Sequence, residues 1–182
     1  MLATDGVDPT QINQYKELRN QFKELIEVGY NKMVKYETST KGFEWFGTSP
    51  GHEVLTAYGL TLFTKMKQHG KFVNQDTMDR TKQWLMSRLN QDGSITLNPK
   101  QLDTFGRAAQ TVSEVYILWV LSEIDPQGSY SSLAQRVDNL MKNNEDPYLL
   151  ALYTLTLVNF NQTDKAIPFA KKITTKQDLT TG

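Results

Sequence analysis

The sequence predicts an all-helical fold made of repeated helical hairpins. Apolar residues recur at three- and four-residue intervals in seven segments, which is the period of an α-helix. Turns after the first, third and fifth of these segments recur at intervals of roughly 50 residues, a spacing typical of helical repeats. Segments that are apolar on every side alternate with segments that have one apolar face, and this alternation favours two layers of helices.

The first two helices flank a loop rich in aromatic residues. One helix is predicted from Pro9 to about Tyr36, and its apolar face comprises Tyr15, Leu18, Phe22, Leu25, Ile26 and Met33. The loop 42–51 contains Gly and Pro, which stop a helix. A second helix is predicted at 53–68, before a C-capping Gly70, with Val54, Leu55, Tyr58, Leu62, Phe63 and Met66 facing inward.

The third and fourth helices have different patterns. The third, about 76–90, is amphipathic through Met78, Trp84, Leu85 and Leu89, whereas the fourth, about 110–124, is apolar nearly all round. A helix of the second kind usually lies inside a core. The segment 94–106 between them is predicted to be mostly loop, because Pro99 would break a helix.

The last three helices continue the alternation. The fifth is amphipathic through Leu133, Val137, Leu140 and Met141. The sixth, about 147–159, is apolar all round, and the seventh, about 164–174, is amphipathic through Ala166, Phe169 and Ile173. We assign residues 1–175 to one helical domain and residues 176–182 to a flexible tail.

The spacing of the turns predicts an α/α toroid, in which inner and outer helices alternate around a ring. Gly42 and Gly93 each follow an amphipathic helix and lie 51 residues apart, and residues 143–147 form a third turn. Seven helices would make an incomplete ring with two unsealed ends. Apolar faces at those ends should promote self-association.

Composition excludes several classes of function. The 182 residues include 20 Lys+Arg and 20 Asp+Glu, so the zero net charge gives no reason to expect nucleic acid or an anionic membrane as a partner. There is no cysteine, which excludes a thiol nucleophile or a thioester made by this chain alone. We find no signal peptide and no apolar run long enough to span a bilayer, and expect either a cytoplasmic protein or an internal piece of a longer one.

Five motifs occur in the same order as in a known family. They are Gly29-Tyr30-Asn31-Lys32-Met33, Gly42-Phe43-Glu44-Trp45-Phe46-Gly47, Leu55-Thr56-Ala57-Tyr58, Trp84-Leu85 followed by Gln91-Asp92-Gly93-Ser94, and Tyr148-Leu149-Leu150-Ala151-Leu152. Together they resemble the thioester-containing domain of the α2-macroglobulin and complement family over about residues 1–175. The resemblance implies an α/α toroid, which agrees with the ring inferred from the turns.

The resemblance also implies a function. In that family a Cys–Gln thioester reacts with an attacking protease or a target surface. We therefore expect a non-enzymatic, extracellular part of a protease-trapping (endopeptidase-inhibiting) or surface-tagging protein, with no catalytic, cofactor-binding or metal-binding residue of its own. Its partners would be other domains of a larger parent and, through the parent, a protease or surface. Nucleic acid and membrane insertion are not expected.

The resemblance singles out one position for chemistry. Complement-type members carry a catalytic His where this chain has Asp103, and that His converts the thioester into a more reactive acyl intermediate. Members of the macroglobulin type, which lack the His, react preferentially with amines. Transfer to hydroxyl groups is therefore not expected here.

Two alternatives from other classes stay open. An α/α-toroid enzyme acting on a sugar or isoprenoid would use carboxylates near the starts of inner helices, and the candidates are Glu44, Glu53, Asp103 and Glu114. The competing interpretation of these residues is helix capping and solvated charge. A helical-repeat module would instead bind peptides on its inner surface.

Two other motifs have ordinary explanations. His52-Glu53 begins like the zinc motif His-Glu-x-x-His, but Thr56 stands at the fifth position and the other histidine, His69, is distant, so His52 is expected at a helix start. Phe43, Trp45 and Phe46 could form a platform for a ligand, but burial between helices is the preferred interpretation.

One motif concerns covalent modification. Asn161-Gln162-Thr163 is a sequon for N-glycosylation and lies at a predicted turn between helices. It fits a secreted parent.

Overall fold

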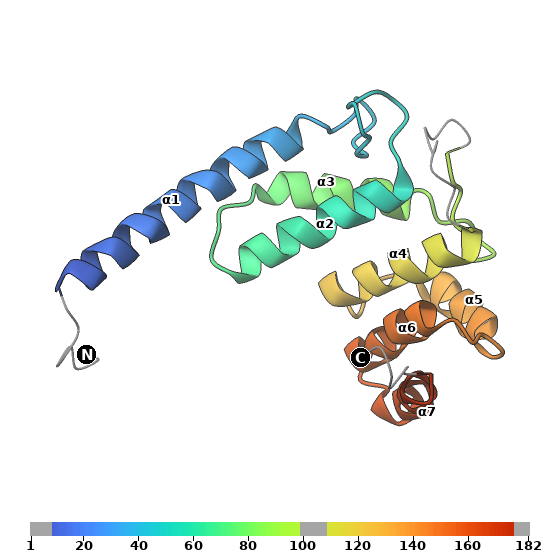
Figure 1. Ribbon diagram of the computed structural model, residues 1–182. Helices are drawn as coiled ribbons and strands as arrows, with labels where there is room; N and C mark the ends of the chain where they lie inside the picture. The colour runs from blue at the N-terminus through green and yellow to red at the C-terminus, as the bar shows by residue number, and fades with distance from the viewer. Residues whose placement is uncertain (1–8, 99–108, 177–182) are drawn as a thin grey trace. The chain divides into compact units, whose positions relative to one another are not determined.

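The chain is all-helical in the residues that the structure describes. A computed structural model describes residues 9–98 and 109–176, with side chains from residue 13 onward. This part contains α1 (Pro9–Val34), α2 (Glu53–Gln68), α3 (Gln75–Met86), α4 (Gln110–Ile124), α5 (Ser131–Met141), α6 (Pro147–Asn159) and α7 (Thr163–Thr174) (Figure 1). Its only extended pairings are two isolated β-bridges. None of these seven helices combines the length and hydropathy needed to cross a membrane.

The chain divides into two units, Met1–Tyr36 and Glu37–Gly182, and the first contains α1. This helix has 26 residues, and its predicted apolar face forms. Most of that face is exposed to solvent: Tyr15, Leu18, Phe22 and Leu25 each expose between 48% and 70% of their surface. This long helix therefore presents an apolar stripe that packing within the unit does not cover.

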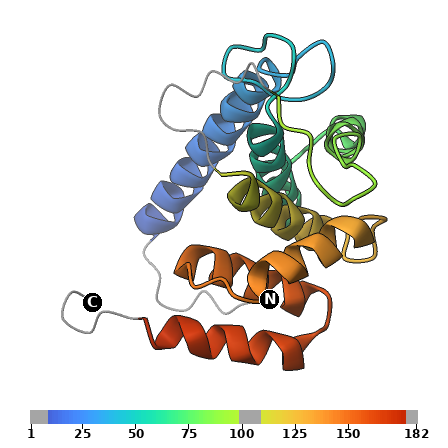
Figure 2. The same ribbon diagram turned by 90° about the vertical axis from the view of Figure 1, so that its right-hand side faces the viewer.

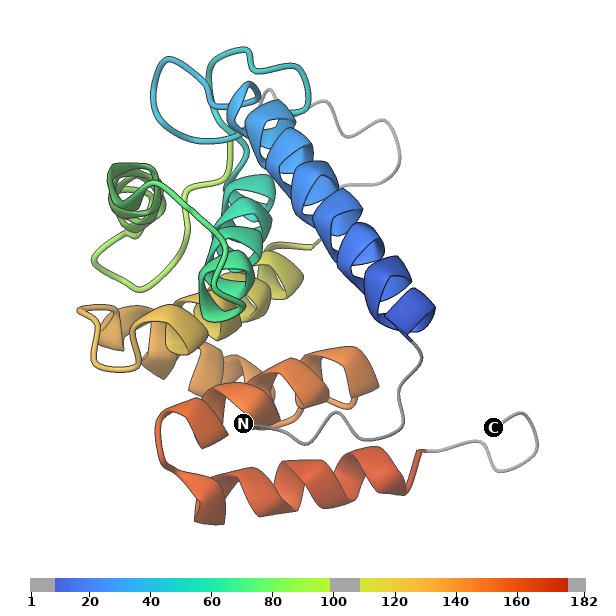
Figure 3. The same cartoon turned by 90° about the vertical axis from the view of Figure 1, so that its left-hand side faces the viewer.

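The second unit consists of helical hairpins in two layers. The inner helices α2, α4 and α6 pack one after another, and each carries an outer helix: α3 packs on α2, α5 on α4 and α7 on α6. Figures 2 and 3 show the last hairpin clearly, with α6 and α7 lying side by side. This alternation of inner and outer helices is the arrangement of an α/α toroid, as predicted.

The inner helix α4 explains why some segments are apolar all round. It packs against α2 on one side, α6 on another and its own outer helix α5 on a third. Five of its apolar side chains, Val115, Ile117, Leu118, Val120 and Leu121, expose 1% or less of their surface. A helix surrounded in this way has apolar residues on every side, so its sequence lacks amphipathic periodicity.

The turns that precede α2 and α4 repeat each other with a period of 52 residues. One β-bridge joins Glu37 to Phe43 and the other joins Leu89 to Ile95. Within these turns Lys41 and Gly93 both have left-handed backbones, with φ of 77° and 81°. The predicted equivalence of Gly42 with Gly93 was therefore wrong by one residue, because a lysine occupies the left-handed position of the first turn.

The first turn is fixed to the helix that follows it through Phe43. The Phe43 N–H donates to Thr56 Oγ1 at 2.8 Å, and its carbonyl accepts from the His52 N–H at 2.7 Å. The Phe43 ring is buried and meets Phe63 edge to face, with ring centroids 5.8 Å apart. Both backbone groups are thus satisfied by α2 and its N-cap while the ring enters the core.

The buried face of α2 differs from the prediction. Phe63 is buried as expected, but Tyr58 is 53% exposed, and the most buried neighbours are Thr56, Ala57 and Leu60. The buried face of α2 combines the large side chains of Leu60 and Phe63 with the smaller residues Thr56, Ala57 and Gly59. The prediction weighted large apolar residues and therefore missed the small ones on this face.

The outer helix α3 is shorter than predicted. It ends at Met86 instead of continuing to about Asn90. Residues after it form the second turn, in which the Asn90 N–H donates to the Ser94 carbonyl at 2.9 Å and Leu89 pairs with Ile95. These tertiary pairings outweigh the helical periodicity of Leu89.

Candidate functional site at the starts of the inner helices

Two glutamates near the starts of inner helices are completely buried. Glu53 is the first residue of α2, Glu114 lies in the first turns of α4, and both are 0% exposed. The interpretation of these two residues as solvated charges was wrong, because water does not reach them. A buried carboxylate is retained only where paired charges and hydrogen bonds compensate for lost hydration.

Glu53 is compensated by the turn that precedes α4. Arg88 Nε donates to Glu53 Oε1 at 2.9 Å, and the Asn98 N–H donates to Oε2 at 3.0 Å. The same guanidinium donates through Nη2 to the Thr96 carbonyl at 3.0 Å and lies 5.7 Å from the centroid of the Trp84 ring. One arginine therefore joins α2, the end of α3 and the turn.

Asn98 links the turns before α2 and α4. Its side chain is nearly buried, and Nδ2 lies 3.3 Å from the Pro50 carbonyl oxygen and 3.4 Å from that of Gly51. Its backbone N–H also donates to Glu53, so Asn98 is bonded to Pro50, Gly51 and Glu53. The end of the turn is consequently held at a defined position.

Glu114 is compensated in a parallel way on the next hairpin. Its Oε1 accepts from Gln110 Nε2 at 2.8 Å and from the Ile95 N–H at 3.3 Å, and Oε2 accepts from Arg136 Nε at 2.8 Å. The hydrogen bond to Glu114 raises the pKa of the Arg136 guanidinium. Gln110 Nε2 also donates to the Ile95 carbonyl at 2.7 Å, so α4 satisfies both backbone groups of Ile95.

The two buried glutamates therefore hold the same turn from opposite sides. Ile95 binds Glu114 and Asn98 binds Glu53. The position singled out by the resemblance, Asp103, lies in the segment 99–108, outside the described residues. Asn98, just before that segment, is bound to Glu53 at the start of α2. Gln110 is the first residue of α4 and is bound to Ile95 and Glu114.

The remaining described candidate, Glu44, accepts hydrogen bonds within its own loop. It is 7% exposed, and its Oε2 accepts from the Phe46 N–H at 2.8 Å and from Thr48 Oγ1 at 3.2 Å. Each of the three candidate glutamates that the structure describes is thus engaged in internal bonds. Glu53 and Glu114 flank one turn, whereas Glu44 stabilises another.

The prediction for the aromatic loop is confirmed for one residue and wrong for two. Phe43 is buried, but Trp45 is 54% exposed and Phe46 is 73% exposed. The Phe43 ring belongs to a bridge residue whose backbone is bound to α2. Trp45 and Phe46 lie in the turn that closes when the Phe46 N–H donates to the Glu44 carboxylate, and their rings lie on the surface.

The two histidines lie at opposite ends of α2. His52 is the N-cap, and its Nδ1 accepts from the Leu55 N–H at 3.4 Å, which confirms the prediction of a helix start. His69 is the C-cap residue and is exposed. Across the described ranges, no group of three or more His, Cys, Asp or Glu side chains has the arrangement of a metal site.

The inner helices also bring aromatic residues together. Burial is the main cause that raises the pKa of Tyr116 of α4 to about 12, and the nearby phenols of Tyr148 of α6 and Tyr58 of α2 raise it further. Trp119 lies beside it, with ring centroids 5.6 Å apart. The Trp119 Nε1 is buried and has no hydrogen-bond partner among the described residues.

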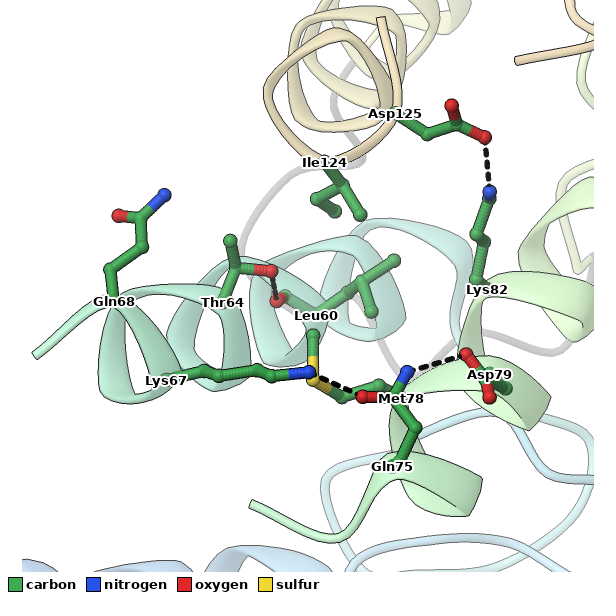
Figure 4. A pocket seen from close by; sticks show the side chains of 10 residues that line it. All are labelled: Leu60, Thr64, Lys67, Gln68, Gln75, Met78, Asp79, Lys82, Ile124 and Asp125. Carbon is green, nitrogen blue, oxygen red and sulfur yellow. Dashed lines mark hydrogen bonds and ion pairs between the residues drawn. The ribbon is translucent and has the colours of Figure 1, made fainter. Parts of the chain in front are cut away.

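A pocket of about 430 Å³ lies at the other end of α2, between α2, α3 and the end of α4. Figure 4 shows its polar side chains bonded to one another: Lys82 pairs with Asp125, and Gln75 accepts from Lys67 and donates to Asp79. The charged groups that line it are thus engaged with their neighbours. Sequence reasoning did not find this pocket, because its lining comes from three separate helices.

A comparison with known families decides the classification. The family model described as the A-macroglobulin TED domain matches residues 8–178. The chain belongs to the A-macroglobulin TED domain family. No curated protein matches the chain. The family match confirms the resemblance to the thioester-containing domain and agrees with the α/α arrangement of the helices.

Within this TED domain, sequence reasoning missed the partners of the buried glutamates. Arg88 is 35 residues from Glu53, and Arg136 is 22 residues from Glu114. No local pattern links residues at such separations. The sequence did offer one indication: Glu114 stands near the start of a helix that is otherwise apolar. If such a helix is buried on all sides, its carboxylate requires a partner.

Proposed function

We propose that this TED domain is a non-enzymatic helical scaffold of an extracellular, macroglobulin-like thioester protein. The observation that carries the proposal is the family match over residues 8–178, nearly the whole chain. The chain has no cysteine, so the thioester would come from a segment outside these 182 residues. The scaffold would shield that thioester until a protease acts on the parent.

The bonding of the buried glutamates supports a scaffold role. Glu53 accepts from Arg88 and Asn98, and Glu114 accepts from Ile95, Gln110 and Arg136. A general acid or base needs a proton site within reach of a substrate. These side chains instead stabilise the turn that leads to residue 99 and the helix that follows residue 109.

The sequence at Asp103 favours transfer to amines. Family members with a His at this position transfer to hydroxyl groups through an acyl intermediate, and this chain has no His there. Losing a positioned general base or nucleophile typically costs about 10²–10⁴ in rate. We therefore infer trapping of proteases through their lysine amines in preference to tagging of carbohydrate surfaces.

The test uses the native full-length protein purified from its source. It is incubated with labelled methylamine or labelled glycerol, and released thiol is measured with a maleimide dye. Incorporation of methylamine with an equal amount of released thiol, and little incorporation of glycerol, is the expected result. A protein that incorporates neither compound and releases no thiol would contradict the proposed thioester parent.

A protease challenge tests the trapping role. The native protein is mixed with trypsin, and complexes that survive detergent are sought by gel electrophoresis. The matched control is the same protein treated beforehand with unlabelled methylamine, which should abolish the covalent complexes. Trypsin that stays fully active on a protein-sized substrate and forms no complex would contradict trapping.

A further inference from the structure

The turn between α6 and α7 contains the sequence Asn161-Gln162-Thr163, which the proposed function does not use. It is the only Asn-x-Ser/Thr motif in the 182 residues. Such motifs accept N-linked oligosaccharides when they lie on the surface of a secreted protein. The structure shows whether the side chains of this motif are available and whether the fold itself needs them.

The backbone of this turn requires a left-handed residue but not an asparagine. Asn161 has φ of 58°, its N–H donates to the Val158 carbonyl at 2.9 Å, and the Gln162 N–H donates to the Leu157 carbonyl at 2.8 Å. These two bonds form a Schellman motif, in which Gly is the preferred left-handed residue.

The end of α2 provides a matched comparison within the same chain. There Gly70 has φ of 67°, its N–H donates to the Lys67 carbonyl at 3.0 Å, and the Lys71 N–H donates to the Met66 carbonyl at 2.9 Å. A glycine thus forms the same motif without any side chain. The amide group of Asn161 is not needed to end the helix.

The polar groups of the motif are free to react. Asn161 and Thr163 are exposed, and neither side chain has a hydrogen-bond partner in the described part of the chain. Thr163 is the first residue of α7, two positions after Asn161. The acceptor amide and the hydroxyl of the motif are therefore both accessible to solvent at one tight turn.

We propose that Asn161 carries an N-linked glycan. This inference rests on the proposed extracellular location, because the donor of the glycan acts in the secretory pathway. The donor is a polyprenyl diphosphate-linked oligosaccharide. The Asn161 Nδ2 forms a bond to the anomeric carbon of the first sugar, the bond from that carbon to the diphosphate oxygen breaks, polyprenyl diphosphate leaves, and the amide loses one proton to base.

The glycan has a structural consequence for the assembled parent. Val158, whose carbonyl closes the turn, is 46% exposed on the last turn of α6. A hydrated oligosaccharide on Asn161 would cover this apolar surface and exclude another domain from the turn between α6 and α7. The parent's neighbouring domains would then dock elsewhere on this unit.

The decisive experiment maps the glycan on the native secreted protein. The purified protein is treated with peptide N-glycosidase in ¹⁸O-water, digested and analysed by mass spectrometry. The peptide that contains Asn161 should appear mainly in a form in which this side chain has become an ¹⁸O-labelled aspartate. Recovery of that peptide with unmodified Asn161 before treatment, at full yield from the secreted protein, would overturn the proposal while leaving the proposed function intact.

Variants expressed through the same secretory pathway provide the controls. Asn161→Gly keeps the left-handed turn, as Gly70 does, and Thr163→Ala removes the hydroxyl; both should lose the glycosidase-sensitive mobility shift. Thr163→Ser preserves the motif and should keep the shift. Wild-type protein found only in the cytosol would contradict both the proposed function and the glycan. A shift that persists in Asn161→Gly would place the sugar elsewhere and overturn the assignment.

Discussion

Lys41 and Gly93 occupy equivalent positions in two successive turns and share a left-handed backbone, with φ of 77° and 81°. Their surroundings differ. Lys41 is exposed, whereas Gly93 is buried, and a Cβ on Gly93 would lie 2.2 Å from the Ser132 carbonyl oxygen of α5. Both positions of the repeat therefore have the same backbone conformation, but only position 93 requires glycine.

This difference predicts opposite tolerance at the two positions. Gly93→Ala should lower the free energy of unfolding by about 2–5 kcal/mol, because it adds left-handed strain and a clash with backbone. Lys41→Gly should change it by less than about 1 kcal/mol, since relief of strain offsets the greater freedom of the unfolded chain. Urea denaturation followed by circular dichroism measures both. Equal effects would contradict the steric role assigned to Gly93.

The buried ion pairs predict an asymmetry between partners. Arg136→Met leaves Glu114 charged and buried without its cation, so we expect a loss of about 3–5 kcal/mol in the free energy of unfolding. Glu114→Gln should cost less, because the Arg136 side chain is 33% exposed and can turn toward water. Chemical denaturation of the single and double variants gives the comparison.

The exposed ion pairs of Glu145 with Lys172 and Lys176 are the matched control for Glu114. Glu145 is 60% exposed, and Glu145→Gln should leave the denaturation midpoint unchanged within error. If Glu145→Gln and Arg136→Met prove equally destabilising, burial does not determine the importance of these pairs.

Buried tyrosines predict a loss of stability in alkali. Burial is the largest cause that raises the pKa of Tyr116 and Tyr130 to about 12 from an ordinary value of 10. Below about pH 10 both folded and unfolded states keep these protons, so the stabilisation is complete. As pH rises from about 10 to 12, the unfolded state loses the protons first and stability falls.

Absorbance at alkaline pH separates these tyrosines from exposed ones. In an ultraviolet titration the buried phenols should ionise later than the exposed residues and together with unfolding. Tyr130→Phe should reduce the slope of unfolding free energy against pH above about pH 10. The same slope in Tyr130→Phe and wild type would argue against a contribution from Tyr130.

Exposed apolar stripes predict self-association of the isolated chain. Leu25 on α1 is 66% exposed and Leu155 on α6 is 49% exposed. Leu25→Glu and Leu155→Glu should each reduce association in sedimentation velocity, because a charge makes burial of either stripe unfavourable. Gln135→Glu, at an exposed polar position of α5, is the control and should not change it. A wild-type monomer at all concentrations would contradict the prediction.

The sequence alone determined the all-helical class, the alternation of inner and outer helices and the bounds of most helices. The bounds of α2, α4 and α6 agree with the prediction because caps and turn residues act locally: His52 and Asp146 accept N–H groups at the starts of α2 and α6. Hydrophobic periodicity and capping depend on residues a few positions apart, which a sequence displays directly.

The tertiary structure decided which residues those helices bury and which charges they share. Tyr58 and Trp45 lie on the surface, although both are large enough for a core, because Tyr58 lies off the buried face of α2 and Trp45 lies in the turn closed through Glu44. Glu53 and Glu114 are buried because Arg88 and Arg136 reach them from distant segments. Packing and charge compensation depend on groups brought together only by folding, so local pattern could not predict them.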